Sequence, residues 1–339
     1  MPTLWGEQLS KREFLARVGH HQQVGGLRRV RRVEGVEDGL DVIELRTGAG
    51  LELDILASRG LDLGAAWYQG RPLSWLSASG FAHPALREST PGGFERAFGG
   101  GLLTTCGLSN VGNANTDQGT EYVQHGRAAT TPAFDVGLQH EWAGEELLMT
   151  VSGKTREAVL YGDQLEKTRT LRAQLGVAGL ELEDRIENIG ARPAEVHLLY
   201  HLNLGWPLIG PGTALHLPTT GQRGVVGDAS DWATLAAPNA AWTVGVTEHQ
   251  LRADADGWVR AQLEAPGMRF RLAYSANLSR FTQWRQFGRG DYVLGLEPGT
   301  VGVLGRAAER AAGTLNTLLE PGERLIYRLR LAVEPVFPP

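Results

Sequence analysis

Short runs of alternating apolar and polar residues, separated by glycine-containing turns, recur along most of this chain. Segments such as GLELEDRIENIG, AEVHLLYHLNL and ERLIYRLRLAVEP have the two-residue period of a β-strand that buries one face. The turn at residues 47–50, between two such runs, is typical of a hairpin. Because strands and helices do not alternate along the chain, a doubly wound nucleotide-binding fold is disfavoured. The pattern predicts an all-β fold, built as a large antiparallel β-sandwich.

No internal boundary divides the chain. Its 45 glycines are spread over turn positions rather than gathered in a linker, so we predict one sandwich domain over residues 1–339. Ser10 and Glu13 have the spacing of a capping box, which predicts a short helix within an N-terminal lead-in at residues 1–25. The arginine-rich segment 27–32 alternates with Val30, as expected of a solvated edge strand. Residues 78–117 are glycine-rich and irregular, which indicates functional loops.

Charge and cysteine content narrow the classes of function. A net charge of −5 gives no general attraction to nucleic acids or anionic membranes. No apolar run reaches the ~18 residues of a membrane span, and the N-terminus lacks the apolar core of a signal peptide. The single cysteine, Cys106, excludes an internal disulfide, suits a reducing compartment and has no evident activating neighbour. We therefore expect a cytoplasmic protein without a nucleic-acid or membrane partner.

The segment DYVLGLEPGT, residues 291–300, carries Glu297 at the end of an apolar strand. Burying a carboxylate is costly unless it has a partner or a catalytic role. Gly295 lies two residues earlier on the same face and leaves room above the sheet for a bound molecule. Gln283 and Trp284 form a pair common in sugar sites, where a ring packs on C–H groups and an amide binds hydroxyls. A salt bridge to a nearby arginine is the structural alternative for Glu297.

The segment EVHLLYHLNLGW places His197, His201 and Asn203 on one face of a strand. On a helix the two histidines would stand one turn apart as a metal pair. On a strand they lie ~13 Å apart, too far to share an ion, so we expect no metal and no other cofactor. His201, beside Asn203 and near the strand end, is the better candidate for a site. A hydrogen-bonded core histidine is the alternative.

Two other segments supply candidate ligand-binding residues. His125 ends an alternating run and is followed by Gly126, where the backbone can approach a ligand closely. Arg127 comes next and is suited to pair with a substrate hydroxyl or a carboxylate. Arg59 and Asp62 lie at a strand end in LASRGLDLG and either pair with each other or hold substrate.

Taken in chain order, the segments QHGRAATTPA, YHLNLGWPL and YVLGLEPGT resemble motifs of the galactose mutarotase (aldose 1-epimerase) superfamily. RGLDLGAAWYQGRPLSW, GGLLTTCGLSNVG and TQWRQFGRGDYVLGLEPGT are similar to the DUF4432 branch of that superfamily. The resemblance implies the galactose mutarotase-like supersandwich fold. It matches His125 and His201 to the two histidines of the family and Glu297 to its glutamate. The family's loop arginine has no match in GGGLLTTCGLSNVG, and the upstream Arg59 is the candidate replacement.

The resemblance further implies an isomerase that interconverts sugar anomers by opening and reclosing the ring. This chemistry needs a base at the anomeric hydroxyl and an acid at the ring oxygen, which we expect on opposite sides of the ring. We assign Glu297 as the base, His201 as the acid and His125 as a second donor. The expected sugar contacts are Arg59, Asp62, Gln283, Trp284, Asn203 and Arg127. A non-catalytic carbohydrate-binding protein, and an isomerase or lyase acting at another carbon, remain as alternatives.

Overall fold

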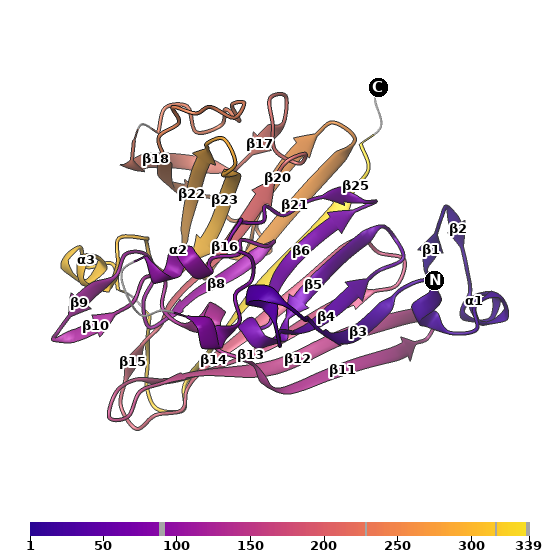
Figure 1. The fold of residues 1–339 in the computed structure, drawn as a ribbon, viewed down its shortest axis with the longest axis horizontal. Coiled ribbons are helices and arrows are strands. Elements are labelled where there is room, and N and C mark those ends of the chain that lie inside the picture. The colour runs from indigo at the N-terminus through magenta and orange to yellow at the C-terminus, as the bar shows by residue number, and fades with distance from the viewer. Residues whose placement is uncertain (88–91, 228, 316, 337–339) are drawn as a thin grey trace.

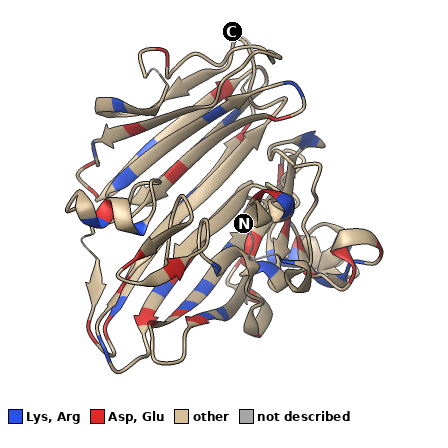
Figure 2. Ribbon diagram, turned by 60° about the vertical axis from the view of Figure 1, so that its left-hand side comes forward, with Lys and Arg blue, Asp and Glu red and all other residues tan. Residues whose placement is uncertain are grey.

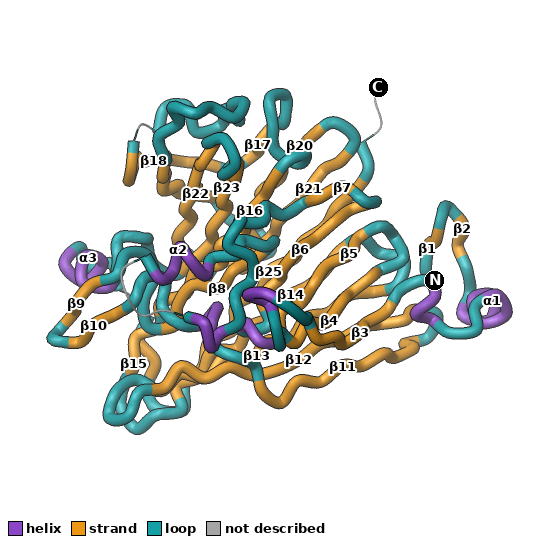
Figure 3. The backbone as a smooth tube through the Cα atoms, viewed as in Figure 1, coloured by secondary structure: helices purple, strands orange, loops and turns teal. Residues whose placement is uncertain are grey.

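Two large antiparallel β-sheets face each other as a sandwich and make up most of the molecule (Figure 1). The computed structural model describes residues 1–87, 92–227, 229–315 and 317–336. Within these residues the helices are few and short (Figure 3), and none is long and apolar enough to cross a membrane. The predicted all-β sandwich is therefore confirmed.

In the described part of the chain, the larger sheet, sheet A, has eleven strands and the smaller, sheet B, has eight. Sheet A runs in the order β18 (Thr219–Val226), β19 (Gly245–Leu251), β22 (Arg280–Phe287), β23 (Tyr292–Gly299), β16 (His197–Gly205), β8 (Leu103–Leu108), β6 (Asp62–Tyr68), β5 (Leu51–Leu56), β4 (Asp41–Arg46) and β3 (Gly26–Arg31), with β7 (Arg71–Pro72) beside β6. Sheet B runs in the order β11 (Phe134–Ala143), β12 (Glu146–Ala158), β13 (Gln164–Gln174), β14 (Gly179–Asn188), β25 (Arg324–Glu334), β21 (Met268–Ser275), β20 (Trp258–Ala265) and β17 (Ala214–His216).

Smaller elements lie around the sandwich. Two-stranded pairs are formed by β1 (Thr3–Leu4) with β2 (Glu7–Gln8), β9 (Asn115–Asp117) with β10 (Thr120–Tyr122), and β15 (Ala194–Glu195) with β24 (Leu318–Leu319). The α-helices are α1 (Lys11–Arg17), α2 (Gly93–Ala97) and α3 (Arg306–Ala311), and the 3-10 turns are His21–Gln23, Gly35–Glu37, Ala57–Arg59, Pro84–Leu86 and Ala128–Thr130.

The strands of sheet B alternate between buried and exposed side chains, as the sequence pattern predicts. Every second side chain of β13 packs into the interior, and Leu171 there is about 1% exposed. Charged residues of both signs lie along the strands (Figure 2), and exposed pairs such as Arg156 with Glu166 join neighbouring strands. A pair of this kind contributes ~0.2–1 kcal/mol, whereas full burial of a leucine contributes ~1.5–3 kcal/mol. Packing between the sheets therefore dominates the stability.

Three strands in the middle of sheet A are buried on both faces. Every side chain of β8, β16 and β23 is buried, because the sandwich interior covers one face and α2 with neighbouring loops covers the other. A strand covered on both faces need not alternate between apolar and polar residues, and β8 does not. For this reason the sequence analysis did not separate β8 from the irregular region at residues 78–117. The alternation seen in the sequence of β16 predicted burial of one face, and the structure corrects this to both faces.

A buried ion pair network connects the two sheets. Arg169 of β13 donates to Asp62 of β6 at 2.9 Å and to Asp184 of β14 at 2.6 and 2.8 Å. The Tyr200 hydroxyl of β16 donates to Asp184 at 2.8 Å, and Thr105 donates to Asp62 at 2.6 Å. The expectation that Asp62 contacts a sugar conflicts with this placement, because its carboxylate lies in the sandwich interior. The sequence reasoning missed the partner because Arg169 is 107 residues away along the chain.

Three local expectations from the sequence agree with the structure. Ser10 and Glu13 form a capping box at the start of α1, with the Glu13 backbone N–H donating to the Ser10 hydroxyl at 3.2 Å. The turn at residues 47–50 joins β4 to β5. The arginine-rich segment forms β3, which lies at the edge of sheet A.

Replacing Arg169 with Met should destabilise the fold strongly, because two buried carboxylates would lose their shared counter-charge. We expect a loss of roughly 3–5 kcal/mol in the free energy of unfolding, measured by denaturant titration. The control is Arg156→Met, which removes an exposed pair and should cost less than about 1 kcal/mol. Equal losses in the two variants would contradict a structural role for the buried network.

Candidate active site

The register of sheet A sets His201 opposite Glu297. Strand β16 pairs with β23 so that Leu202 lies beside Leu296 and Asn203 beside Gly295. The next position in this antiparallel register brings the imidazole Nε2 of His201 to 3.2 Å from the carboxylate Oε1 of Glu297. Because neighbouring residues such as Leu202 and Leu296 point into the sandwich, this pair lies on the outer face of the sheet.

The pair is buried and offers polar atoms that are not hydrogen-bonded. His201 is 7% exposed and Glu297 is 2% exposed. Despite the 3.2 Å separation, Glu297 Oε1 lacks a well-aligned hydrogen bond within the described residues, as does His201 Nδ1. Buried polar atoms without partners are uncommon and mark a place where a ligand or water completes the bonding.

Burial shifts both pKa values towards the neutral forms. It raises the pKa of Glu297 from 4.5 to about 8. It lowers the pKa of His201 from 6.5 to about 3, with the nearby His125 adding to the effect. At neutral pH the pair therefore holds one mobile proton, and its two sites titrate as a unit. A carboxylic acid beside a neutral imidazole can both give and accept a proton.

Gly295 makes room for this arrangement. A Cβ atom added to Gly295 would lie 2.5 Å from Glu297 Oε1 and 3.3 Å from His201 Cε1. The absent side chain of Gly295, expected to leave room for a bound molecule, thus gives space first to Glu297 and His201. Trp284 lies beside Gly295 on the next strand, with its ring centroid 5.3 Å from that of His201.

His125 reaches the same place from a loop. Its ring centroid lies 6.2 Å from that of His201, and the two rings are nearly perpendicular at 82°. The residue has a left-handed backbone with φ of 53°, which Gly126 continues at 66°. The Gly112 N–H donates to His125 Nδ1 at 3.3 Å, so the ring proton of the neutral imidazole sits on Nε2. Burial lowers the pKa of His125 to about 4, which favours that neutral form.

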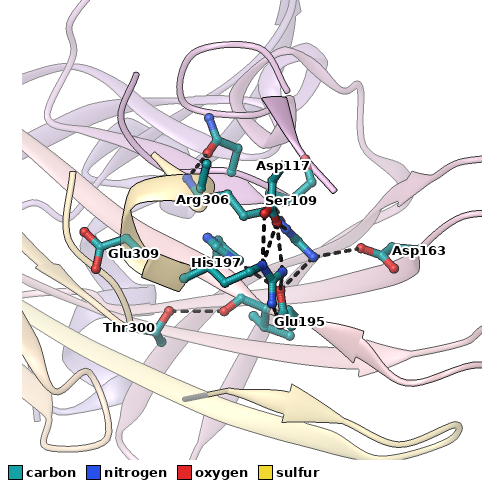
Figure 4. A network of polar contacts seen from close by, with 12 residues as sticks. Ser109, Asp117, Asp163, Glu195, His197, Thr300, Arg306 and Glu309 are labelled. Carbon is teal, nitrogen blue, oxygen red and sulfur yellow. Dashed lines mark hydrogen bonds and ion pairs between the residues drawn. The ribbon is translucent and has the colours of Figure 1, made fainter. Parts of the chain in front are cut away.

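A polar network around Arg306 fixes the loop that carries His125 (Figure 4). Arg306, at the start of α3, pairs with Asp117 at 3.1 Å. Its backbone N–H donates to the side chain of Asn110 at 3.0 Å. Asn110 in turn donates to the carbonyl oxygen of Val123 at 2.8 Å, two residues before His125. These contacts replace regular secondary structure in holding the loop.

His197 belongs to that network and not to the site with His201. Its Nε2 lies 4.0 Å from Glu195 Oε2, and burial lowers its pKa. Glu195 also pairs with Arg306 at 2.8 Å. His197 and His201 lie four residues apart along β16, which is the strand spacing expected from the sequence.

A cavity of about 480 Å³ lies over the His201–Glu297 pair. Its volume falls in the range of small-molecule sites. His201, Glu297 and His125 all line it, together with Thr282. Four aromatic rings and two amides also line it: Trp75, Phe94, Phe98, Trp284, Asn113 and Gln124. Apolar rings with a few polar groups suit a ligand that has both C–H faces and hydroxyls.

His201 and Glu297 lie side by side, not on opposite sides of a ring. The 3.2 Å approach of His201 and Glu297 leaves no space for a sugar between them, so this detail of the sequence-based expectation is wrong. The chemistry does not require separation, because the anomeric hydroxyl and the ring oxygen are both bonded to C1. A sugar lying over the pair can present both oxygens to it.

Of the residues expected to contact a sugar, only Trp284 is among the described residues that line this cavity. Trp284 lines the cavity, but Gln283 points to the opposite face, where it bonds the Trp232 carbonyl at 2.8 Å and His249 at 3.0 Å. Adjacent residues of a strand face opposite ways, so Gln283 and Trp284 cannot act as one pair on a ligand. Asn203 donates to the carbonyl oxygens of Gly101 and His201 and so supports the strand under the site.

The two arginines of the expected set lie outside this cavity. Arg127 is exposed and lines a different hollow near Glu157. Arg59 is 5% exposed and donates to the carbonyl oxygens of Ala82 and Ala97, where it holds the end of α2. Arg59 lines a neighbouring cavity instead.

Several site residues were missed in the sequence. Phe94 and Phe98 lie on and beside the short helix α2, and Phe98 packs edge-on to His201 at 5.5 Å. The glycines that flank GGFERAF were a signal of a close-packed loop, but they did not indicate which rings face the site. Cys106, weighed as a nucleophile, is fully buried, and burial raises its pKa well above the usual range.

The raised pKa of Glu297 predicts a pH-dependent cost to stability. Between pH 4.5 and about 8 the folded protein holds a proton on Glu297 that the unfolded chain has released. The free energy of unfolding of the wild type therefore falls as the pH rises through this range. The Glu297→Gln variant has no such titrating group at this position and should not show this fall. We expect the free energy of unfolding of the variant, relative to that of the wild type, to rise by roughly 2–4 kcal/mol between pH 5 and pH 9. Denaturant unfolding of both proteins at several pH values measures this, and a constant difference would contradict it.

Comparison with solved structures identifies the fold class. The chain resembles a putative aldose 1-epimerase from Klebsiella pneumoniae with a TM-score of 0.84 at 22% identity, covering 91% of this chain and 83% of that one. A galactose mutarotase-like protein from Clostridium acetobutylicum gives a TM-score of 0.63 at 13% identity over 93% of this chain and 100% of that one. Galactose 1-epimerase from Lactobacillus acidophilus gives a TM-score of 0.60 at 13% identity, over 92% of this chain and 99% of that one.

Sequence comparison adds the family. No curated protein sequence matches the chain. The model of a family described as "Domain of unknown function (DUF4432)" matches residues 37–333, which is most of the chain. The resemblance seen in the motifs is thereby confirmed, and the chain belongs to the DUF4432 family, with the fold of the galactose mutarotase-like proteins.

Proposed function

We propose that the protein is an aldose 1-epimerase, an isomerase that interconverts sugar anomers by acid/base catalysis at His201 and Glu297. The observation that carries this proposal is the 3.2 Å approach of the buried Nε2 and Oε1 atoms on the floor of an aromatic-walled cavity. Structures named as a "putative aldose 1-epimerase" and a galactose 1-epimerase share the fold, which supports the same reaction class.

One proton shared by the pair is sufficient for the reaction. The proton rests on Glu297 and first passes to His201, whose Nε2 lies 3.2 Å from Oε1. The Glu297 carboxylate then takes the proton of the anomeric hydroxyl while His201 protonates the ring oxygen. The C1–O5 bond breaks, C1 becomes an aldehyde carbon, and the proton of the pair now resides on Glu297. After rotation about C1–C2, the reverse transfers close the ring on the other face and return the proton to His201. No net proton is consumed, and each group contributes about 10²–10⁴-fold in rate.

His125 completes the acid side. Because its Nδ1 accepts from Gly112, its Nε2–H is the atom free to donate. A donor at the ring oxygen would stabilise the charge that develops when the C1–O5 bond breaks. Trp284 and Phe98 flank His201, with ring centroids at 5.3 and 5.5 Å, and suit the C–H faces of a sugar.

Replacing Glu297 with Gln should abolish anomer exchange while keeping the fold. The amide is nearly isosteric but cannot carry the shared proton, so we expect a loss of at least about 10²-fold. Exchange NMR on a panel of aldoses measures the rate of anomer interconversion, and circular dichroism checks the fold. His201→Asn should give a comparable loss.

The matched control is Glu248→Gln. Glu248 lies in the same cross-strand row, beyond Thr282, and its carboxylate pairs with Arg223 and Arg280. This variant should keep wild-type exchange. Full activity in Glu297→Gln would contradict the assignment, and sugar binding without exchange in the wild type would favour a binding protein.

A further inference from the structure

A second cavity adjoins the one over His201 and Glu297. It has a volume of about 380 Å³ and shares four lining residues with the first: Phe94, Phe98, Gln124 and His125. Thr104 of β8, which lines the second cavity, pairs directly with His201 on β16. Thr104 and Glu297 are therefore two strand spacings apart, about 10 Å. One ligand that extends from the acid and base past His125 can enter both cavities.

Charged residues are segregated between the two cavities. The carboxylates of Glu95 and Asp291 and the protonated Glu297 line the first, where no described arginine or lysine is found. Arg59 and Arg87 line the second, where Glu121 is the one carboxylate among the described residues. An anionic group on a ligand would be repelled from the first cavity and attracted to the second.

The two arginines are held at the second cavity by main-chain oxygens. Arg87 is half-buried and donates from Nη2 to the carbonyl oxygen of Gly126 at 3.1 Å, directly after His125. Arg59 donates to the carbonyls of Ala82 and Ala97 at 2.5 and 3.0 Å. Among the described residues, neither guanidinium has a carboxylate within the 4.0 Å of an ion pair.

Positive charge at this depth is costly without an anion. Burial lowers the pKa of Arg59 and of Arg87, although a guanidinium stays charged at any physiological pH. A phosphate, sulfonate or carboxylate matches the planar donor fork of arginine. Asp62 and Glu37 act on Arg59, and Glu157 acts on Arg87, only from beyond ion-pair distance. The donor groups that these carboxylates do not contact therefore suit a ligand that carries such a group.

The geometry points to a substrate class: an acidic sugar whose anionic substituent occupies the cavity lined by Arg59 and Arg87 while its anomeric carbon lies over His201 and Glu297. This inference rests on the proposed function for the placement of the anomeric carbon. The anion is a carboxylate, phosphate or sulfonate, and Arg87 is its main contact because the Arg59 N–H groups are partly used by Ala82 and Ala97.

Binding to the Glu297→Gln variant tests the subsite without turnover. The probes are glucose, glucuronate, glucose 6-phosphate and glucose with a sulfonate at C6, titrated by calorimetry. We expect one of the three anions to bind at least about 10-fold more tightly than glucose, and the anion that does so identifies the group. Adding Arg87→Met should weaken the binding of that anion by about 10- to 100-fold and leave the affinity for glucose unchanged.

Two further variants make the test specific. Arg87→Lys keeps the charge and should recover part of the lost affinity, which a merely unfolded variant would not. Arg71→Met removes an arginine that lines a hollow sharing no residue with either cavity and should change nothing. Glucose binding as tightly as every anion, or equal losses for glucose and anions in Arg87→Met, would overturn the inference.

Failure of the inference and failure of the proposed function give different results. Anomer exchange of neutral and acidic sugars at equal rates by the wild type would support the epimerase and overturn the anionic subsite. Arg87-dependent binding of an anion with no exchange of any sugar would support the subsite and contradict the epimerase.

Discussion

The pairing of β16 with β23 is the constraint on which the site depends. Its antiparallel register puts Leu202 against Leu296 and so brings His201 and Glu297 within 3.2 Å on the outer face of sheet A. A slip of one residue in either strand would turn its own member of the pair into the sandwich interior and away from the other. Leu202 and Leu296 belong to the main hydrophobic core, so the packing that stabilises the fold also positions His201 and Glu297.

The rest of the site is a cover over those strands. The aromatic residues around α2 and the loop ending in His125 enclose the outer face, and this enclosure shifts the pKa of Glu297 up and that of His201 down. Because the cover has little regular structure, it needs specific polar anchors. Arg306 with Asp117 and Asn110 supplies them on one side, and Arg59 supplies them under α2. Hydrogen bonds and an ion pair thus hold a cover whose backbone is irregular.

Much of the fold could be predicted because alternation reports burial of one face. The same rule placed Glu297 near the end of its strand and on the face that the cavity covers. His201 also lies on that face, but it is in the middle of β16 and not near its end, as the sequence had suggested. The rule failed for β8, because that strand is buried on both faces. It also could not identify Arg169 as the partner of Asp62, because the two residues are far apart in the sequence. Gln283 shows a different error, since alternation itself excludes it from the face of Trp284. The aromatic cover and the neighbouring arginine-lined cavity arise from tertiary packing that no local pattern encodes.

A crystal structure of the Glu297→Gln variant with a bound sugar tests the central claim most directly. The account predicts that C1 lies over β16 and β23, with the anomeric hydroxyl and the ring oxygen in hydrogen-bond reach of residue 297 and His201 Nε2, and with His125 close to the ring. A sugar seated elsewhere, or one whose C1 points away from both side chains, would contradict it.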